Sequence, residues 1–380
     1  MPVFECRLQR TRLILMFLAA ISGSCAAPTA RVPTPTSEEL AGERMRQIDI
    51  FVRSYLDYEN RLLNHGHRIL VGAAPLCEKK GYVHGIALFN PAAIKDSDMR
   101  NMFMQRISAT DSQDGLYVTR TGSVDVSADN LLPIGSRVVE IDGTAVSDVR
   151  DAQRRLAGSE QATIAYVHDG SVRTMVHRGT LGCDYELVFS PTDEPNAWTD
   201  GTRIVVTRGL MRFVQNDSEL AFVVAHELAH LVRGHLEATR RNAVVGGFIG
   251  LIFDALVLAA GVDTGGAFAR AGAEMAVQTY SADFEREADY VSLYILHRSG
   301  YDIGAVAEFW RRYGSTVDPA SIKYARTHPT SPERFLILDK TKAEIQDKVA
   351  RGLPVLPEEK SATDVGSPTP AGSPSSGEAS

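Results

Sequence analysis

The apolar residues of the chain change their spacing twice along its length. From residue 37 to 74 they recur at helical intervals, and Thr36 and Glu39 at the start are spaced as a capping box. This pattern predicts a long N-terminal helical segment. The stretch 26–36 before it is rich in Pro and Thr, which indicates a linker.

A second pattern extends from residue 75 to 182. Short runs alternate apolar and polar residues and are separated by Asp and Gly turns, which indicates half-buried strands. Residues 131–146 resemble the central segment of a PDZ domain, and 149–156 resemble its helix. Such domains bind an extended peptide as an added strand. We predict a small β-rich, PDZ-like module, with a β-rich spacer that binds no peptide as the alternative.

Helical spacing returns from 183 to 352, interrupted by one strand-like run near 196–206. The predicted fold class is therefore α+β: a mainly helical domain with a small sheet, joined to the β-rich module. The composition changes past Pro354, and residues 361–380 are rich in Ser, Pro, Gly and Ala, which predicts a disordered tail over 353–380.

The helical domain contains the run His226-Glu227-Leu228-Ala229-His230. On a helix the two histidines are about 40° apart, so both imidazoles can bind one metal ion. The pattern is typical of a zinc site in which the intervening glutamate, Glu227, accepts a proton from the attacking water. Apolar flanking residues favour a buried active-site helix.

A third ligand must complete the site, because a catalytic zinc has three protein ligands and one open position. Glu285 and Asp289 are four residues apart in a segment with helical character. One carboxylate can bind zinc while the other steadies a histidine, and the spacing leaves open which does which. We predict one Zn²⁺ per chain.

These motifs, together with the stretch 196–206, resemble the HtpX and CAAX-prenyl protease family of zinc metallopeptidases, which includes bacterial periplasmic and mitochondrial Oma-type members. The resemblance covers residues 185 to 345. It implies a zincin-type metallopeptidase domain over 183–352, with Glu285 as the third ligand and Asp289 as the acid behind the ligands.

A late segment, His328-Pro329 followed by Arg334, matches a further motif of that family. His328, Arg334 and Tyr280 are therefore candidates for stabilising the oxyanion of peptide hydrolysis. For His328, a role in pinning the last loop is the alternative. His235 is half a turn away from His226 on a straight helix, so we predict that it does not bind the same metal.

The chemistry predicts a zinc metalloendopeptidase, and the resemblance implies misfolded or misassembled cell-envelope proteins as substrates. An extended substrate is expected along an edge strand that includes Asn196, Arg203, Ile204 and Val205. Two alternatives stay open: a chaperone-like or peptide-binding envelope factor with a latent zinc site, and a structural lipoprotein whose zinc only staples the fold.

The N-terminal residues predict where this chemistry takes place. Three arginines precede the apolar run Leu13 to Ile21, and small residues follow it, which is typical of a secretory signal over 1–25. Cys25 stands where a bacterial lipoprotein carries its lipidated cysteine, and ordinary cleavage near Ala26 to Ala30 is the alternative. We predict an exported protein of the bacterial periplasm or envelope.

Two cysteines, Cys77 and Cys183, lie outside the signal region. In an oxidising compartment they can form a disulfide, and their spacing is not that of a metal-binding pair. The sequence alone does not show whether they meet.

The segment 243–262 is almost wholly apolar and lies between the two halves of the zinc motif. Its length can span a bilayer. Asp254 in its middle would cost about 2.5 to 3.5 kcal/mol on insertion, and a single span would carry Glu285 across the membrane. We predict a hydrophobic helix or hairpin beside the active site. Membrane attachment through this segment and a lipidated Cys25 stays open, as does a span.

The overall charge narrows the choice of partner. A net charge of −7 provides no basic surface for nucleic acid. Polypeptides are therefore the predicted partners, and the sequence does not indicate an oligomeric state.

Overall fold

The computed structural model describes residues 30–109, 114–122, 131–259, 264–304, 306–317 and 332–360. The chain divides into two compact units, residues 1–47 and 48–380. Helix α2 (Ser37–Gly72) begins in the first unit and continues into the second. The predicted capping box is confirmed at its start. The backbone N–H of Thr36 donates to Glu39 Oε2 at 2.7 Å, and the backbone N–H of Glu39 donates to Thr36 Oγ1 at 3.2 Å.

The β-rich region is confirmed as a sheet, whereas its PDZ character stays a prediction. The main strands lie in the order β2, β3, β4, β6, β7, all antiparallel, with β5 beside β4. Helix α4 packs on the same apolar core as β3, β4 and β6. The elements are η2 (Pro91–Ala93), α3 (Ser97–Arg106), α4 (Val149–Ala157), β2 (Ala87–Phe89), β3 (Leu116–Arg120), β4 (Arg137–Ile141), β5 (Thr144–Ala145), β6 (Gln161–His168) and β7 (Ser171–Arg178).

A disulfide ties the beginning of this region to its end. Cys77, which follows η1 (Ala74–Leu76), is bonded to Cys183, with Cα atoms 5.6 Å apart. Next to the bond, β1 (Lys80–Val83) pairs antiparallel with β8 (Thr180–Cys183). The bonded cysteines are 106 residues apart. A loop of that size removes about 4 to 5 kcal/mol of unfolded-chain entropy in the loop-closure description.

A second, small sheet contains β9 (Glu186–Ser190), β10 (Ala197–Thr199) and β11 (Arg203–Thr207). Strand β11 lies in its centre, antiparallel to β10 and parallel to β9. The prediction that Arg203, Ile204 and Val205 lie on the sheet edge is therefore wrong, because β11 is paired on both sides. Strand β10, which directly follows Asn196, forms one edge and lies next to helix α6.

Six helices complete the described part of the chain: α5 (Arg208–Phe213), α6 (Asp217–Val232), α7 (His235–Ala259), α8 (Ala267–Arg298), α9 (Val306–Val317) and α11 (Pro332–Ala350). Buried residues of α6, α8, α9 and α11 form one apolar core with α2 and the small sheet. The predicted tail is ordered in its first part, 353–360, which is a correction. Side chains of α11 and α8 hold its backbone: Lys348 Nζ donates to Leu356 O at 2.6 Å, and Glu358 N donates to Tyr290 Oη at 2.9 Å.

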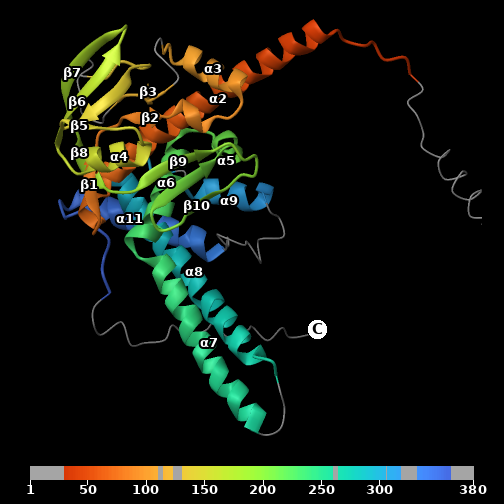
Figure 1. Ribbon diagram of the computed structural model, residues 1–380. Helices are drawn as coiled ribbons and strands as arrows, with labels where there is room; N and C mark the ends of the chain where they lie inside the picture. Colours follow the sequence, from red (N-terminus) through yellow and green to blue (C-terminus); the bar gives the residue numbers. More distant parts are fainter. Residues whose placement is uncertain are drawn as a thin grey trace, which may run out of the picture. The chain divides into compact units, whose positions relative to one another are not determined.

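Helices α7 and α8 lie side by side as a long hairpin (Figure 1). The apolar segment supplies most of α7, so the predicted hydrophobic helix is observed for residues 243–259. Most of its large apolar side chains are exposed, so the predicted packing beside the active site is not observed for them. Among the helices of the described ranges, none is long and apolar enough to cross a membrane.

Candidate metal centre

Helix α6 holds its two histidines rigidly. At its start the side chain of Asn216 accepts a hydrogen bond from Glu219 N at 3.0 Å, and Glu219 Oε2 accepts one from Gln215 N at 2.8 Å. These bonds satisfy amide groups that a helix start leaves unpaired. Every residue from Glu219 to Ala229 is buried. The helix is therefore packed on all sides where His226 begins the motif.

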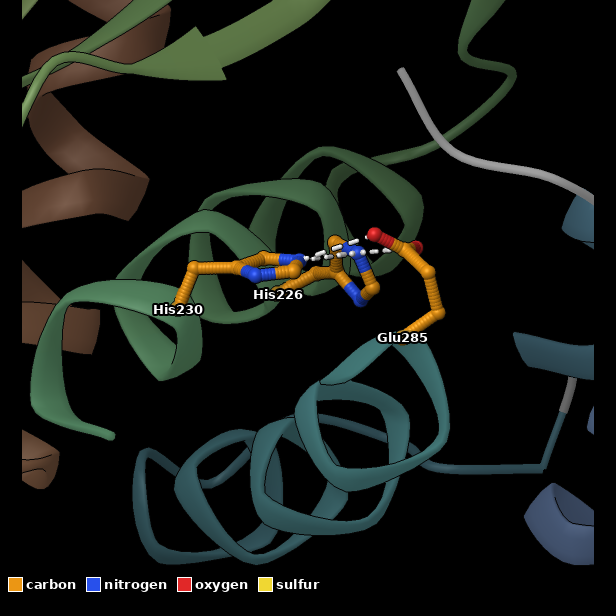
Figure 2. Close-up of side chains that lie close together, drawn as sticks. All are labelled: His226, His230 and Glu285. Atoms are coloured by element: carbon orange, nitrogen blue, oxygen red, sulfur yellow. Dashed lines mark hydrogen bonds and ion pairs between the residues drawn. The ribbon is translucent and has the colours of Figure 1, made fainter. Parts of the chain in front are cut away.

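The side chains of His226, His230 and Glu285 converge from two helices, the imidazoles from α6 and the carboxylate from α8 (Figure 2). His226 Nε2 lies 3.2 Å from His230 Nε2 and 3.3 Å from Glu285 Oε2. His230 Nε2 lies 3.3 Å from Glu285 Oε1. Ligand atoms of a tetrahedral zinc, at bond lengths of about 2.0 to 2.1 Å, are about 3.3 Å apart. The triangle therefore fits zinc, and Glu285 rather than Asp289 faces it.

Asp289 lies behind His226 instead. Its Oδ1 is 3.1 Å from His226 Nδ1 and accepts a hydrogen bond from Trp310 Nε1 at 3.2 Å. Burial alone would raise the pKa of Asp289, but the Arg334 guanidinium and His226 outweigh it and lower that pKa. A carboxylate on Nδ1 fixes the imidazole and directs Nε2 towards the ion. Burial would likewise lower the pKa of His226, but Asp289 and Glu285 raise it.

Arg334 occupies a different position from the one its motif predicts. Its Nε and Nη2 donate to the two oxygens of Asp289 at 2.6 and 2.8 Å, and its Nη1 lies 3.2 Å from Glu285 Oε2. The side chain is 3% exposed and stacks over Trp310. The prediction that Arg334 faces the oxyanion is therefore wrong, because two carboxylates engage its guanidinium. It orients the carboxylates.

Glu227 lies beside the triangle on α6 and is buried. Its negative charge acts on both His230 and Arg334, which places it close to both. Burial lowers the pKa of His230 more than Glu285 raises it, which favours the neutral imidazole that a metal ligand needs.

His235 belongs to this site, although its spacing from His226 argued against a role. Its Nδ1 lies 2.9 Å from His230 Nδ1, and its Nε2 lies 3.1 Å from Glu287 Oε2. Helix α6 ends before it, and Gly234 turns the chain with a φ of 64°. The two helices are thus not collinear, so His235 lies behind His230 and outside the triangle of metal-binding side chains, and the prediction that it does not bind the same metal is not contradicted. Gly234 was the available signal, because glycine commonly ends a helix in this conformation.

The remaining candidates lie outside the described residues. This holds for His328, for Cys25 in the predicted signal and for the side chain of Tyr280. Their roles stay predictions.

Known proteins share this arrangement of motifs. The profile of Peptidase family M48 matches residues 165–342, which contain both halves of the metal triangle. Over residues 165–342 the chain is therefore similar to peptidase family M48. The predicted resemblance to Oma-type zinc peptidases is thereby confirmed.

Individual relatives of this region carry further information. The chain is 28% identical over 202 residues to the "Beta-barrel assembly-enhancing protease" of Escherichia coli O157:H7, which covers 48% of this chain and 40% of that protein. It is 26% identical over 198 residues to "Mitochondrial metalloendopeptidase OMA1" of Schizosaccharomyces pombe, covering 51% and 57%. The chain thus spans about two fifths of the length of the bacterial relative.

Proposed function

We propose that the chain is a zinc-dependent endopeptidase. The observation that carries this proposal is the triangle of His226, His230 and Glu285 inside the region that is similar to peptidase family M48. Catalytic zinc sites use three protein ligands, whereas structural sites are usually closed by four. Within the described ranges, the cluster of metal-binding side chains has these three members.

Each side chain has a role that its position supports. A bound zinc ion would polarise the scissile carbonyl and make the attacking water more acidic. Glu227 acts as the general base, which takes the proton of that water and passes it to the leaving amine. Asp289 and Arg334 keep His226 and Glu285 in place. We retain His328 as the candidate for stabilising the oxyanion.

The substrate is proposed to be an extended polypeptide that pairs with the edge strand β10. This strand lies next to the metal helix α6, and its Trp198 is partly exposed. Main-chain pairing at a sheet edge tolerates many sequences, which suits misfolded or misassembled envelope proteins. The names of the bacterial relatives, with their reference to β-barrel assembly, point in the same direction.

We further propose that the protein acts in the bacterial envelope, anchored through a lipid on Cys25 after removal of the residues before it, 1–24. The disulfide between Cys77 and Cys183 supports export, because such bonds persist in oxidising compartments. Labelled palmitate should be incorporated into the wild-type chain and not into Cys25→Ala. Equal labelling of both chains would contradict the anchor.

The β-rich module is proposed to recruit polypeptide substrates, or to regulate the peptidase, by binding peptides as a PDZ domain does. Its sheet with the single packed helix α4 provides the framework that strand addition requires.

Cleavage of unfolded casein by the purified chain tests the endopeptidase proposal. A chelator should abolish cleavage, and added Zn²⁺ should restore it, because the ligand triangle is proposed to act only when loaded. His226→Ala, purified in parallel, controls for contaminating proteases. Cleavage that persists after zinc has been removed would contradict the proposal.

A further inference from the structure

The outer surface of α7 is apolar and exposed along most of the helix. Val244 is 72% exposed, Phe248 64% and Phe253 54%, and further exposed residues are Val245, Ile249, Leu251, Ile252 and Leu258. At 100° per residue these positions cover about 220° of the helix circumference. Soluble proteins rarely leave so continuous an apolar surface in water. A partner must therefore cover it.

The charge in this segment is turned away from that surface. Asp254, the charged residue within 243–259, accepts hydrogen bonds from Phe268 N at 3.1 Å and Ala269 N at 2.8 Å, and also from the Thr264 hydroxyl. These donors belong to α8 and the turn before it. Arg270 adds a positive charge near the same carboxylate. The exposed side of α7 therefore presents apolar side chains without a competing negative charge.

Positive charge marks the inner end of the same segment. Arg240 and Arg241 are exposed and stand directly before the apolar residues of α7. Arginines at such a boundary reach the headgroup level while their stems stay on apolar surface. They also attract anionic lipids, which the net charge of −7 would otherwise repel.

We propose that the α7–α8 hairpin inserts the apolar side of α7 into one leaflet of an anionic bilayer, with Arg240 and Arg241 at the headgroups. A bilayer explains the exposed arc better than a second copy of the chain, because a protein partner covers one face of a helix whereas lipid surrounds it. The stretch from Val244 to Leu258 rises about 21 Å, more than the roughly 15 Å of hydrocarbon in one leaflet. The hairpin therefore enters at a tilt.

This insertion fixes the distance of the metal centre from the membrane. His235 begins α7 six residues before Arg241, a rise of about 9 Å, and Glu285 lies on the returning helix α8. The substrates would be polypeptide segments at the membrane surface. That last step rests on the proposed endopeptidase function, whereas the insertion itself does not.

Vesicle flotation of the full chain carrying Cys25→Ser tests the insertion without any lipid anchor. The chain should float with vesicles of phosphatidylglycerol and phosphatidylethanolamine, and much less with phosphatidylcholine alone. Phe248→Ser combined with Phe253→Ser should lower the bound fraction at least tenfold. The matched control is Val172→Ser combined with Leu336→Ser, two exposed apolar residues outside the hairpin, which should bind as the parent does. Arg240→Gln with Arg241→Gln should remove the preference for anionic lipid.

The depth of insertion is tested with Phe253→Trp. Brominated lipids should quench the tryptophan fluorescence of this variant more than that of the parent chain. The proposal would be overturned if the parent chain did not float with vesicles, or if both serine pairs lowered the bound fraction equally. It would also be overturned if the chain formed a dimer without lipid and the Phe variants dissociated that dimer. Zinc content and casein cleavage in solution should be unchanged in all hairpin variants. A chain that binds vesicles but cleaves nothing would refute the endopeptidase and leave the insertion standing.

Discussion

His226 and His230 on α6 form a close pair in which His226 is buried and His230 is half-buried, and His84 and His177 form a buried pair in the β-rich region. The two contacts are nearly the same length, 3.2 Å between the Nε2 atoms of the first pair and 3.3 Å between the Nδ1 atoms of the second. Two adjacent imidazoles are therefore not enough to define a metal site. The groups around each pair determine whether the pair can bind a metal ion.

The first pair lies against the carboxylates of Glu285 and Asp289, which raise the pKa of His226 despite its burial. The second pair has the carbonyl oxygen of Ser159, 2.8 Å from His84 Nε2, and burial lowers the pKa of His177 to about 4. Carboxylates in contact with an imidazole favour a bound cation, whereas burial that outweighs the nearby charge favours a neutral ring. The same residue type thus serves as a proposed ligand in one region and as a hydrogen-bonded core residue in the other.

Removing one histidine from each pair should separate the two roles most strongly. His226→Ala should lower bound zinc from one per chain to nearly none and reduce cleavage roughly 1,000-fold, because the ion activates the reaction. His84→Ala should keep the zinc. Inductively coupled plasma mass spectrometry measures the metal. Equal zinc contents in the two variants would erase the proposed distinction.

The next largest effect is expected at the carboxylate behind the metal. Asp289→Asn leaves the buried guanidinium of Arg334 without its main counter-charge, which should cost about 3 to 5 kcal/mol in the free energy of unfolding. It should also weaken zinc binding 10- to 100-fold, because His226 loses its partner. Asp193→Asn is the matched control: this exposed carboxylate pairs with Arg208, and surface pairs contribute less than about 1 kcal/mol. Urea unfolding and chelator competition would show whether the two aspartates differ.

A smaller effect on zinc binding is expected at Glu287, which contacts His235 and not a metal-binding side chain. Glu287→Gln should weaken zinc binding about tenfold, because the carboxylate orients His235 and, through it, His230. Glu359→Gln alters a carboxylate that pairs with Arg233 instead of a histidine, and it serves as the control. Identical zinc affinities in the two variants would show that His235 only fills space.

The smallest effect concerns pH and the second histidine pair. The folded pKa of His177 is about 4, below the unfolded value of about 6.5. Between these values the unfolded chain binds more protons, so the folded state loses stability as pH falls from 6.5 to 4. His177→Gln should flatten this loss by on the order of 1 kcal/mol in urea unfolding at several pH values. Burial lowers the pKa of His67 to about 3, so His67 should still contribute to the loss of stability at low pH in this variant. A variant with an unchanged pH profile would count against the neutral pair.

The sequence predicted the elements with strong periodicity and the residues with motif spacing. Helix α6 and the convergence of His226, His230 and Glu285 follow from patterns within single helices or from the family resemblance. Local spacing also located the strands of the β-rich region. These features need little knowledge of tertiary contacts.

Features that depend on packing between elements were missed. The central position of β11 is set by its partners β9 and β10, which no pattern within Arg203 to Val205 reveals. His235 reaches His230 because the chain turns at Gly234, where α6 has ended and α7 begins in a different direction. The guanidinium of Arg334 could in principle donate to an oxyanion, but its position is determined by Asp289 and Glu285. These carboxylates lie 45 and 49 residues earlier in the sequence.

Zinc content and casein cleavage, measured on one preparation of Glu227→Gln, test the central claim most directly. Glutamine keeps the size of the side chain but cannot accept the proton of the attacking water. The account predicts one bound zinc per chain and cleavage reduced to the level of the His226→Ala chain. Cleavage within a few-fold of wild type by zinc-loaded Glu227→Gln would contradict it.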